Sequence, residues 1–135
     1  MSIQVYFSRK ESELLSSPLL ISLDFHTEII DSNCGYFKAK LIFSDNSKLF
    51  LFELSEIISA TGKVFNEKIR IEKYRYHYQD ANEKMIFRWD NAPHFSKLKS
   101  FPHHLHVGNK IEESIRPSLY KVIMQITKYI IENEK

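Results

Sequence analysis

Histidines are concentrated in one short part of this 135-residue chain. Four of the six lie within thirteen residues, at His94, His103, His104 and His106. Imidazole is the side chain that both accepts and donates a proton near neutral pH without help from its surroundings. Asp90 and Asn91 stand just ahead of the first of these histidines. The segment therefore predicts a site that moves protons or holds a metal ion.

Prolines near both ends of residues 91–103 predict a loop there. Functional side chains commonly sit on loops that a rigid sheet holds in place. If residues 103–107 are extended, the alternation of a strand puts His104 and His106 on one face and His103 on the other.

One interpretation of this segment is metal-independent cleavage of a phosphodiester in RNA. One histidine would take the proton of the ribose 2′-hydroxyl, and another would protonate the leaving oxygen. Arg75 or Arg88 would stabilise the charge that develops on the phosphate. An aromatic side chain such as Trp89 would stack on a base.

Two other interpretations stay open. In the first, His104 and His106 present two imidazoles to one metal ion, with His94 and Asp90 completing the ligand set. The sequence has no His-Glu-x-x-His or Cys-x-x-Cys pattern that would support it. In the second, the histidines are structural and cap strands by bonding backbone carbonyls.

Composition and charge narrow the function classes. The length suits one domain over residues 1–135. Three glycines are too few for a phosphate-cradling loop or a dinucleotide fingerprint, and the single cysteine, Cys34, fits a reducing cytoplasm. No signal peptide or membrane span is expected. Residues 61–110 hold ten Lys and Arg against five Asp and Glu, which favours an anionic ligand on the histidine side.

The first half of the chain predicts a helix and three strands. A short helix within residues 3–16 would stop at Pro18, and residues 19–30 alternate like a half-buried strand. Residues 36–54 predict a hairpin with a two-residue turn at Asp45-Asn46. That turn would pair Leu41 with Phe50, Ala39 with Phe52, Phe37 with Leu54 and Lys38 with Glu53.

Residues 68–90 predict a second hairpin, with a loop at residues 80–83. Pairing Tyr76 with Phe87 and Tyr74 with Trp89 makes one face aromatic. The other face then sets His77 beside Ile86, Lys73 beside Asp90 and Arg75 beside Arg88. Two opposed arginines repel unless solvent separates them or an anion lies between them.

The chain is expected to close with an amphipathic helix that has Pro117 in its first turn. Its apolar stripe recurs at helical spacing, at Leu119, Val122, Ile123, Ile126 and Ile130. The predicted fold class is α+β: a mainly antiparallel sheet of about five strands, with an N-terminal helical segment and this C-terminal helix on one face.

Three strings carry a family resemblance: Tyr74-Arg-Tyr-His-Tyr78, Phe87-Arg-Trp-Asp-Asn-Ala-Pro-His94 and Phe101-Pro-His-His-Leu-His106. With the order of the predicted elements, they resemble the TumE family of toxins from prokaryotic toxin–antitoxin systems, from about residue 10 to 132. The family commonly has Tyr where Trp89 stands, and often Lys where Leu105 stands. The family motif falls on Asp90, Asn91, His94, His103, His104 and His106.

The resemblance implies a small cytoplasmic toxin that a neighbouring antitoxin neutralises, and analogy with other small toxins favours RNA as the target. We therefore expect a ribonuclease with His94 and either His104 or His106 as general acid and base, and Asp90 orienting a histidine. The predicted substrate-binding residues are Arg75, Arg88, His77 and Trp89. No cofactor is expected, and a homodimer is left open. The alternatives are a non-catalytic module that binds nucleic acid or protein, and a metal-dependent hydrolase.

Overall fold

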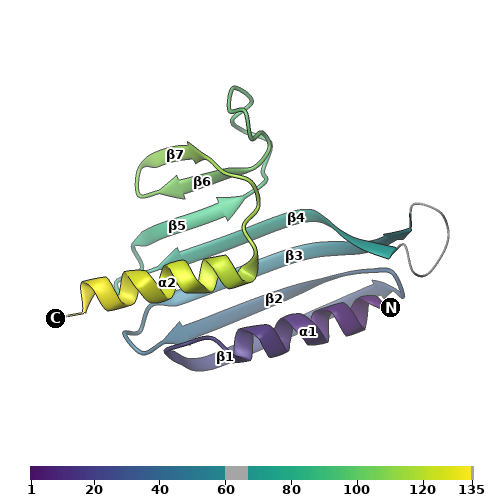
Figure 1. The fold of residues 1–135 in the computed structure, drawn as a ribbon, viewed down its shortest axis with the longest axis horizontal. Coiled ribbons are helices and arrows are strands. Elements are labelled where there is room, and N and C mark those ends of the chain that lie inside the picture. Colours follow the sequence, from purple (N-terminus) through teal and green to yellow (C-terminus); the bar gives the residue numbers. More distant parts are fainter. Residues whose placement is uncertain (60–66, 135) are drawn as a thin grey trace.

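The computed structural model describes residues 1–59 and 67–134. Seven strands form one antiparallel sheet in which the spatial order follows the sequence order. The strands are β1 (Leu20–Asp31), β2 (Cys34–Phe43), β3 (Lys48–Ser59), β4 (Glu67–Gln79), β5 (Met85–Asp90), β6 (His104–Val107) and β7 (Lys110–Glu113). The helices α1 (Ile3–Leu15) and α2 (Leu119–Asn133) both lie on the same face of this sheet (Figure 1).

The α+β class and the helices on one face are confirmed, but the expected number of about five strands is wrong. The additional strands are β6 and β7, which have four residues each. Four residues are the shortest run in which alternation can indicate a strand. Residues 91–103 form the predicted loop, and the extended conformation anticipated for residues 103–107 is present from His104 onward.

Both helices begin at a serine cap. The Val5 N–H donates to Ser2 Oγ at the start of α1, and the Lys121 N–H donates to Ser118 Oγ at the start of α2. Pro117 therefore precedes the cap of α2 and is outside the first turn where it was predicted. The predicted apolar stripe of α2 is buried at all five positions, and Thr127 is buried with it. No helix in the described part of the chain is long and apolar enough to cross a membrane.

The predicted register of the first hairpin is wrong by one residue. The Phe43 N–H donates to the Ser47 carbonyl, so the loop has three residues, with Asn46 at φ 65° and the Ser47 N–H donating to Asp45 Oδ1. An odd loop reverses the faces of the returning strand. Leu51, opposite Ala39, therefore points toward the helices in place of Phe52.

This shift has two consequences for β3. Glu53 joins the helix-facing side and pairs with Phe37, while Lys38 lies opposite Phe52. Phe50 and Phe52 then belong to the opposite face of the sheet. Neither helix covers that face (Figure 1). We call this face the open face.

The second hairpin has the predicted faces but a register that differs by two residues. Arg75 lies opposite Asp90 and His77 opposite Arg88, so the expected Arg75–Arg88 opposition does not occur. The tight loop is closed by Asp80, whose Oδ1 accepts the N–H groups of Asn82 and Lys84. A shift of two residues keeps every side chain on the same face of the sheet, so the buried side chains stay buried. The attractive pair Arg75–Asp90 then replaces the repulsive pair Arg75–Arg88.

Glu53 is fully buried between α1 and the sheet. The hydroxyls of Tyr6 and Tyr76 donate to its two carboxylate oxygens over 2.8 and 2.7 Å, and Ser55 Oγ adds a third donor. Burial, with Glu53 close by, raises the pKa of Tyr76 well above its ordinary value, and the Arg116 side chain donates to the Tyr76 hydroxyl. This cluster joins α1, β3, β4 and the segment before α2.

The register makes a prediction about neighbouring side chains of β3. Leu51→Ala should lower the free energy of unfolding by about 2–5 kcal/mol, because it opens a cavity in the core. Phe50→Ala, on the open face with 36% exposure, should cost only about 1 kcal/mol. Urea unfolding followed by circular dichroism measures both. A larger loss for Phe50→Ala than for Leu51→Ala would contradict the register.

Candidate functional site

Six polar side chains of β4, β5 and β6 form two rows across the open face. In one row, Arg75 pairs with Asp90, which pairs with His104. In the other, His77 pairs with Arg88, which pairs with His106. Adjacent strands are about 4.8 Å apart, so each row brings residues distant in the sequence within side-chain reach of one another.

Asp90 is the centre of this arrangement and is only 5% exposed. Its Oδ1 lies 3.0 Å from His104 Nε2 and accepts the Ala92 N–H over 3.0 Å. Its Oδ2 forms ion pairs with Arg88 Nε at 3.3 Å and His106 Nε2 at 3.8 Å. A buried carboxylate needs such partners, because desolvation of an unpaired charge is costly.

His104 is 1% exposed and fixed at both ring nitrogens. Its Nδ1 lies 3.0 Å from the Pro102 carbonyl, which can only accept, and its Nε2 faces the Asp90 carboxylate. Contacts at both ring nitrogens fix the orientation of this imidazole. His104 thus holds Asp90 from the side away from solvent.

His106 and His77 stand at the two ends of the second row. Burial lowers the pKa of His106. The Asp90 charge acts against this shift, whereas His104 and Arg88 act in the same direction as burial. Burial also lowers the pKa of His77, and the positive charges of Arg88 and Arg75 act in the same direction. Both rings are therefore neutral at pH 7 in the free protein and available to accept a proton.

A hollow of about 310 Å³ lies on the open face. Half of the residues that line it are cationic, namely Lys38, Lys73, Arg75 and Arg88, and the others are Asp90, Phe52, Tyr74 and Ala92. Within residues 1–59 and 67–134, no salt bridge joins Lys38, Lys73 or Arg75 to a carboxylate. Asp90 is already paired with Arg88 and two histidines. The hollow is therefore suited to an anionic group.

The other sequence-predicted residues lie outside this site. His94 is exposed in the loop beside Phe95. His103 points to the helix-covered side, where its Nδ1 lies 2.9 Å from the Tyr74 hydroxyl. Asn91 holds β4 by accepting the Tyr74 N–H and donating to the Glu72 carbonyl.

Trp89 is also directed away from the site. It is 3% exposed among the core side chains, which leaves no ring face for a base to stack on. Phe95 of the loop packs edge-on against His104 and His106 instead, with ring centroids 4.9 and 5.9 Å apart. Phe95 was missed because one aromatic residue in an irregular loop carries no periodic signal.

Comparison with known families confirms the resemblance found in the sequence. The family model described as Toxin TumE matches residues 10–134. The chain belongs to the TumE toxin family. Neither the curated proteins nor the solved structures contain a match.

The TumE match spans β1 to β7 and both rows of the site. Within the described residues, the same site also brings together three possible metal ligands, since donor atoms of Asp90, His104 and His106 lie within 4.8 Å of one another. The His104 Nδ1 contact with the Pro102 carbonyl is an orientation typical of metal-bound histidines. The site therefore suits two kinds of chemistry, proton transfer and metal binding.

Asp90 should support the fold of this TumE protein as well as its site. Asp90→Asn keeps the shape but turns an amide N–H₂ group toward donors, which leaves His104 and Arg88 without a charge partner. We expect the free energy of unfolding to fall by about 3 kcal/mol in urea titrations. Asp24→Asn, at an exposed carboxylate on β1, should change it by less than about 0.5 kcal/mol. Equal effects of the two variants would contradict the role of Asp90.

Proposed function

We propose that this toxin is a ribonuclease that cleaves RNA on the open face without a metal ion. The observation that carries the proposal is the row His77, Arg88, His106, in which two imidazoles flank one guanidinium. Their backbones are about 10 Å apart, two strand spacings, which leaves room for a phosphodiester on Arg88. General acid–base cleavage needs a proton acceptor and a proton donor on opposite sides of such a phosphate.

The proposed reaction is an internal transfer within the RNA. His106 takes the proton of the ribose 2′-hydroxyl, the 2′-oxygen bonds to phosphorus, and the bond to the 5′-oxygen breaks. Protonated His77 gives its proton to that leaving oxygen, and the product is a 2′,3′-cyclic phosphate. The anionic phosphate favours the charged form of His77 once bound, although burial lowers its pKa in the free protein.

Arg88 and Arg75 stabilise the charge that builds up on the phosphate oxygens. Asp90 and His104 do not contact the substrate in this scheme. They are positioning residues that hold Arg88 and His106 in place through the contacts of the Asp90 carboxylate. Compared with the sequence-based hypothesis, His77 replaces His94, and His106 takes the role shared between His104 and His106.

The second candidate is a metal-dependent hydrolase, which the convergence of Asp90, His104 and His106 favours. Two considerations count against it. The site supplies one carboxylate, and its Oδ2 already faces Arg88 at 3.3 Å. A divalent ion there would be close to a guanidinium and beside a hollow lined with Lys38, Lys73 and Arg75, so charge repulsion opposes binding.

Membership of a toxin family supports an antitoxin as the partner of this chain. The cytoplasm, where RNA is accessible, is the compartment that fits such a pair. An antitoxin that neutralises the toxin by covering the open face would present acidic side chains to it, since the hollow is cationic.

The row makes a direct prediction for catalysis. His106→Ala and His77→Ala should each lower the rate of cleavage of a defined single-stranded RNA by about 10²–10⁴, because each removes one proton-transfer group. Induced expression of either variant should no longer arrest bacterial growth. His94→Ala is the matched control: an exposed loop histidine outside the site, which should keep both activities.

Loss of activity in His94→Ala, with activity retained in His77→Ala, would contradict the catalytic role of His77. It would assign that proton transfer to the loop histidine instead. If all three histidine variants still arrest growth while Arg75→Ala and Arg88→Ala do not, the toxin acts by binding without catalysis.

Whether cleavage requires a metal ion can be tested separately. Cleavage by purified protein should be unchanged after dialysis against EDTA, and addition of Zn²⁺ or Mn²⁺ should not accelerate it. His106→Ala measured in parallel should remain inactive with or without metal. Loss of cleavage in EDTA that one of these ions restores would establish the metal-dependent alternative.

A further inference from the structure

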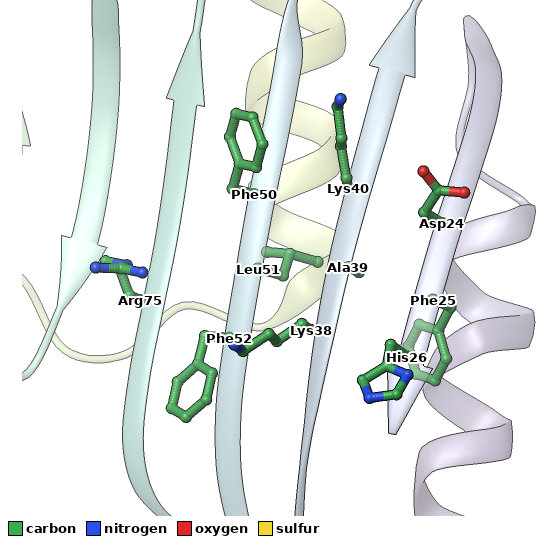
Figure 2. Close-up of a pocket in the computed structure, with 10 residues that line it drawn as sticks. All are labelled: Asp24, Phe25, His26, Lys38, Ala39, Lys40, Phe50, Leu51, Phe52 and Arg75. Carbon is green, nitrogen blue, oxygen red and sulfur yellow. The ribbon is translucent and has the colours of Figure 1, made fainter. Parts of the chain in front are cut away.

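The two rows of the site continue beyond it across the open face. From Arg75, one row runs through Phe52 and Lys38 to His26; from His77, the other runs through Phe50 and Lys40 to Asp24. A larger hollow of about 580 Å³ lies over these residues on β1, β2 and β3. Figure 2 shows it from the open side, with both helices behind the sheet.

This second hollow adjoins the hollow of about 310 Å³ beside Arg88 and Asp90. Lys38, Phe52 and Arg75 line both. Phe50 continues the connection in the other row, because its ring centroid lies 6.2 Å from that of His77. A linear ligand can therefore extend from Arg88 over β4 and onto β3.

Two phenylalanines provide the flat surfaces of the groove. Phe50 and Phe52 are two residues apart on the same face of β3, which separates them by about 6.7 Å. Phe50 is 36% exposed, and neither helix covers Phe52 (Figure 2). An open antiparallel sheet that presents aromatic rings is a recurring platform on which single-stranded RNA stacks its bases.

Lysines stand beside both rings. Lys40 Nζ lies 6.0 Å from the centre of the Phe50 ring, and Lys38 pairs with Phe52 across β2 and β3. Within the described residues neither lysine has a salt bridge, and Asp24 is the only carboxylate that lines the hollow. Alternating rings and cations match alternating bases and phosphates.

We propose that this groove binds single-stranded RNA next to the cleavage site, with bases stacked on Phe50 and Phe52 and phosphates bound by Lys38 and Lys40. The inference deepens the proposed ribonuclease function and rests on it. Single-stranded RNA is favoured over a duplex because paired bases keep their flat faces inside the helix. It is favoured over a protein segment because, among the described residues, Lys38 and Lys40 form no salt bridge with a carboxylate, and their charge suits a regular polyanion.

Binding can be tested apart from catalysis in protein that carries His106→Ala. The probe is a fluorescein-labelled 12-nucleotide single-stranded RNA, and fluorescence anisotropy gives its Kd. Phe50→Ala and Phe52→Ala should each weaken binding by about 5- to 150-fold through loss of one stacked base. Tyr120→Ala, an exposed aromatic on α2 behind the sheet, is the matched control and should leave the Kd unchanged.

The contribution of the lysines can be measured separately, through the salt dependence of RNA binding. The double variant Lys38→Ala, Lys40→Ala should lower the slope of log Kd against log salt by about 1.4, for two lost phosphate contacts. Lys128→Ala, at an exposed lysine of α2, should not change the slope. Circular dichroism on every variant establishes that it is folded.

If folded Phe50→Ala and Phe52→Ala bind RNA with unchanged affinity, the proposal that the groove binds RNA is wrong. The ribonuclease proposal is still supported in that case if His106→Ala abolishes cleavage. Weakened affinity together with full cleavage by His106→Ala supports the groove and overturns the catalytic assignment. If the Phe variants bind RNA normally but escape neutralisation by the antitoxin, the groove is a protein interface and the RNA proposal fails.

Discussion

The sheet is covered by helices on one face only, and the alternation of side chains along its strands decides what each face can do (Figure 1). On β4, Tyr74, Tyr76 and Tyr78 are buried toward the helices, which leaves Arg75 and His77 on the open face. A break in this alternation would exchange core and site. The same residues that make the protein fold therefore prevent the polar side chains between them from turning inward.

The two faces of β4 were predicted correctly and those of β3 in reverse, and the register of both hairpins was wrong. The run from Tyr74 to Tyr78 alternates so strongly that the core face of β4 could be predicted, and a slip of two residues did not disturb it. The first hairpin was less determined, because Leu49, Phe50, Leu51 and Phe52 are all apolar and fit either register. The length of the loop decides the register, and the positive φ of Asn46 suits a three-residue loop as well as the predicted two-residue turn.

The histidine segment shows the same limit for the site. Spacing alone placed His104 and His106 on one face and His103 on the other, and the contacts agree. It could not assign His94, because a loop has no period from which a direction follows. His77 was predicted on the polar face of its hairpin, but its alignment with Arg88 and His106 depends on two strand registers that only the folded sheet defines.

The two buried carboxylates, Glu53 and Asp90, differ in the side chains that bind them. Glu53 accepts hydrogen bonds mainly from hydroxyls, and burial raises the pKa of both tyrosines that bind it, so those two side chains stay protonated across the physiological range. Asp90 is satisfied by two imidazoles and a guanidinium, and one of those imidazoles, His106, reaches the surface. A proton exchanged at His106 changes the charge that Asp90 faces, which a cluster built only for stability would avoid. The difference in partners, more than the burial they share, makes the Asp90 cluster the stronger candidate for a functional site.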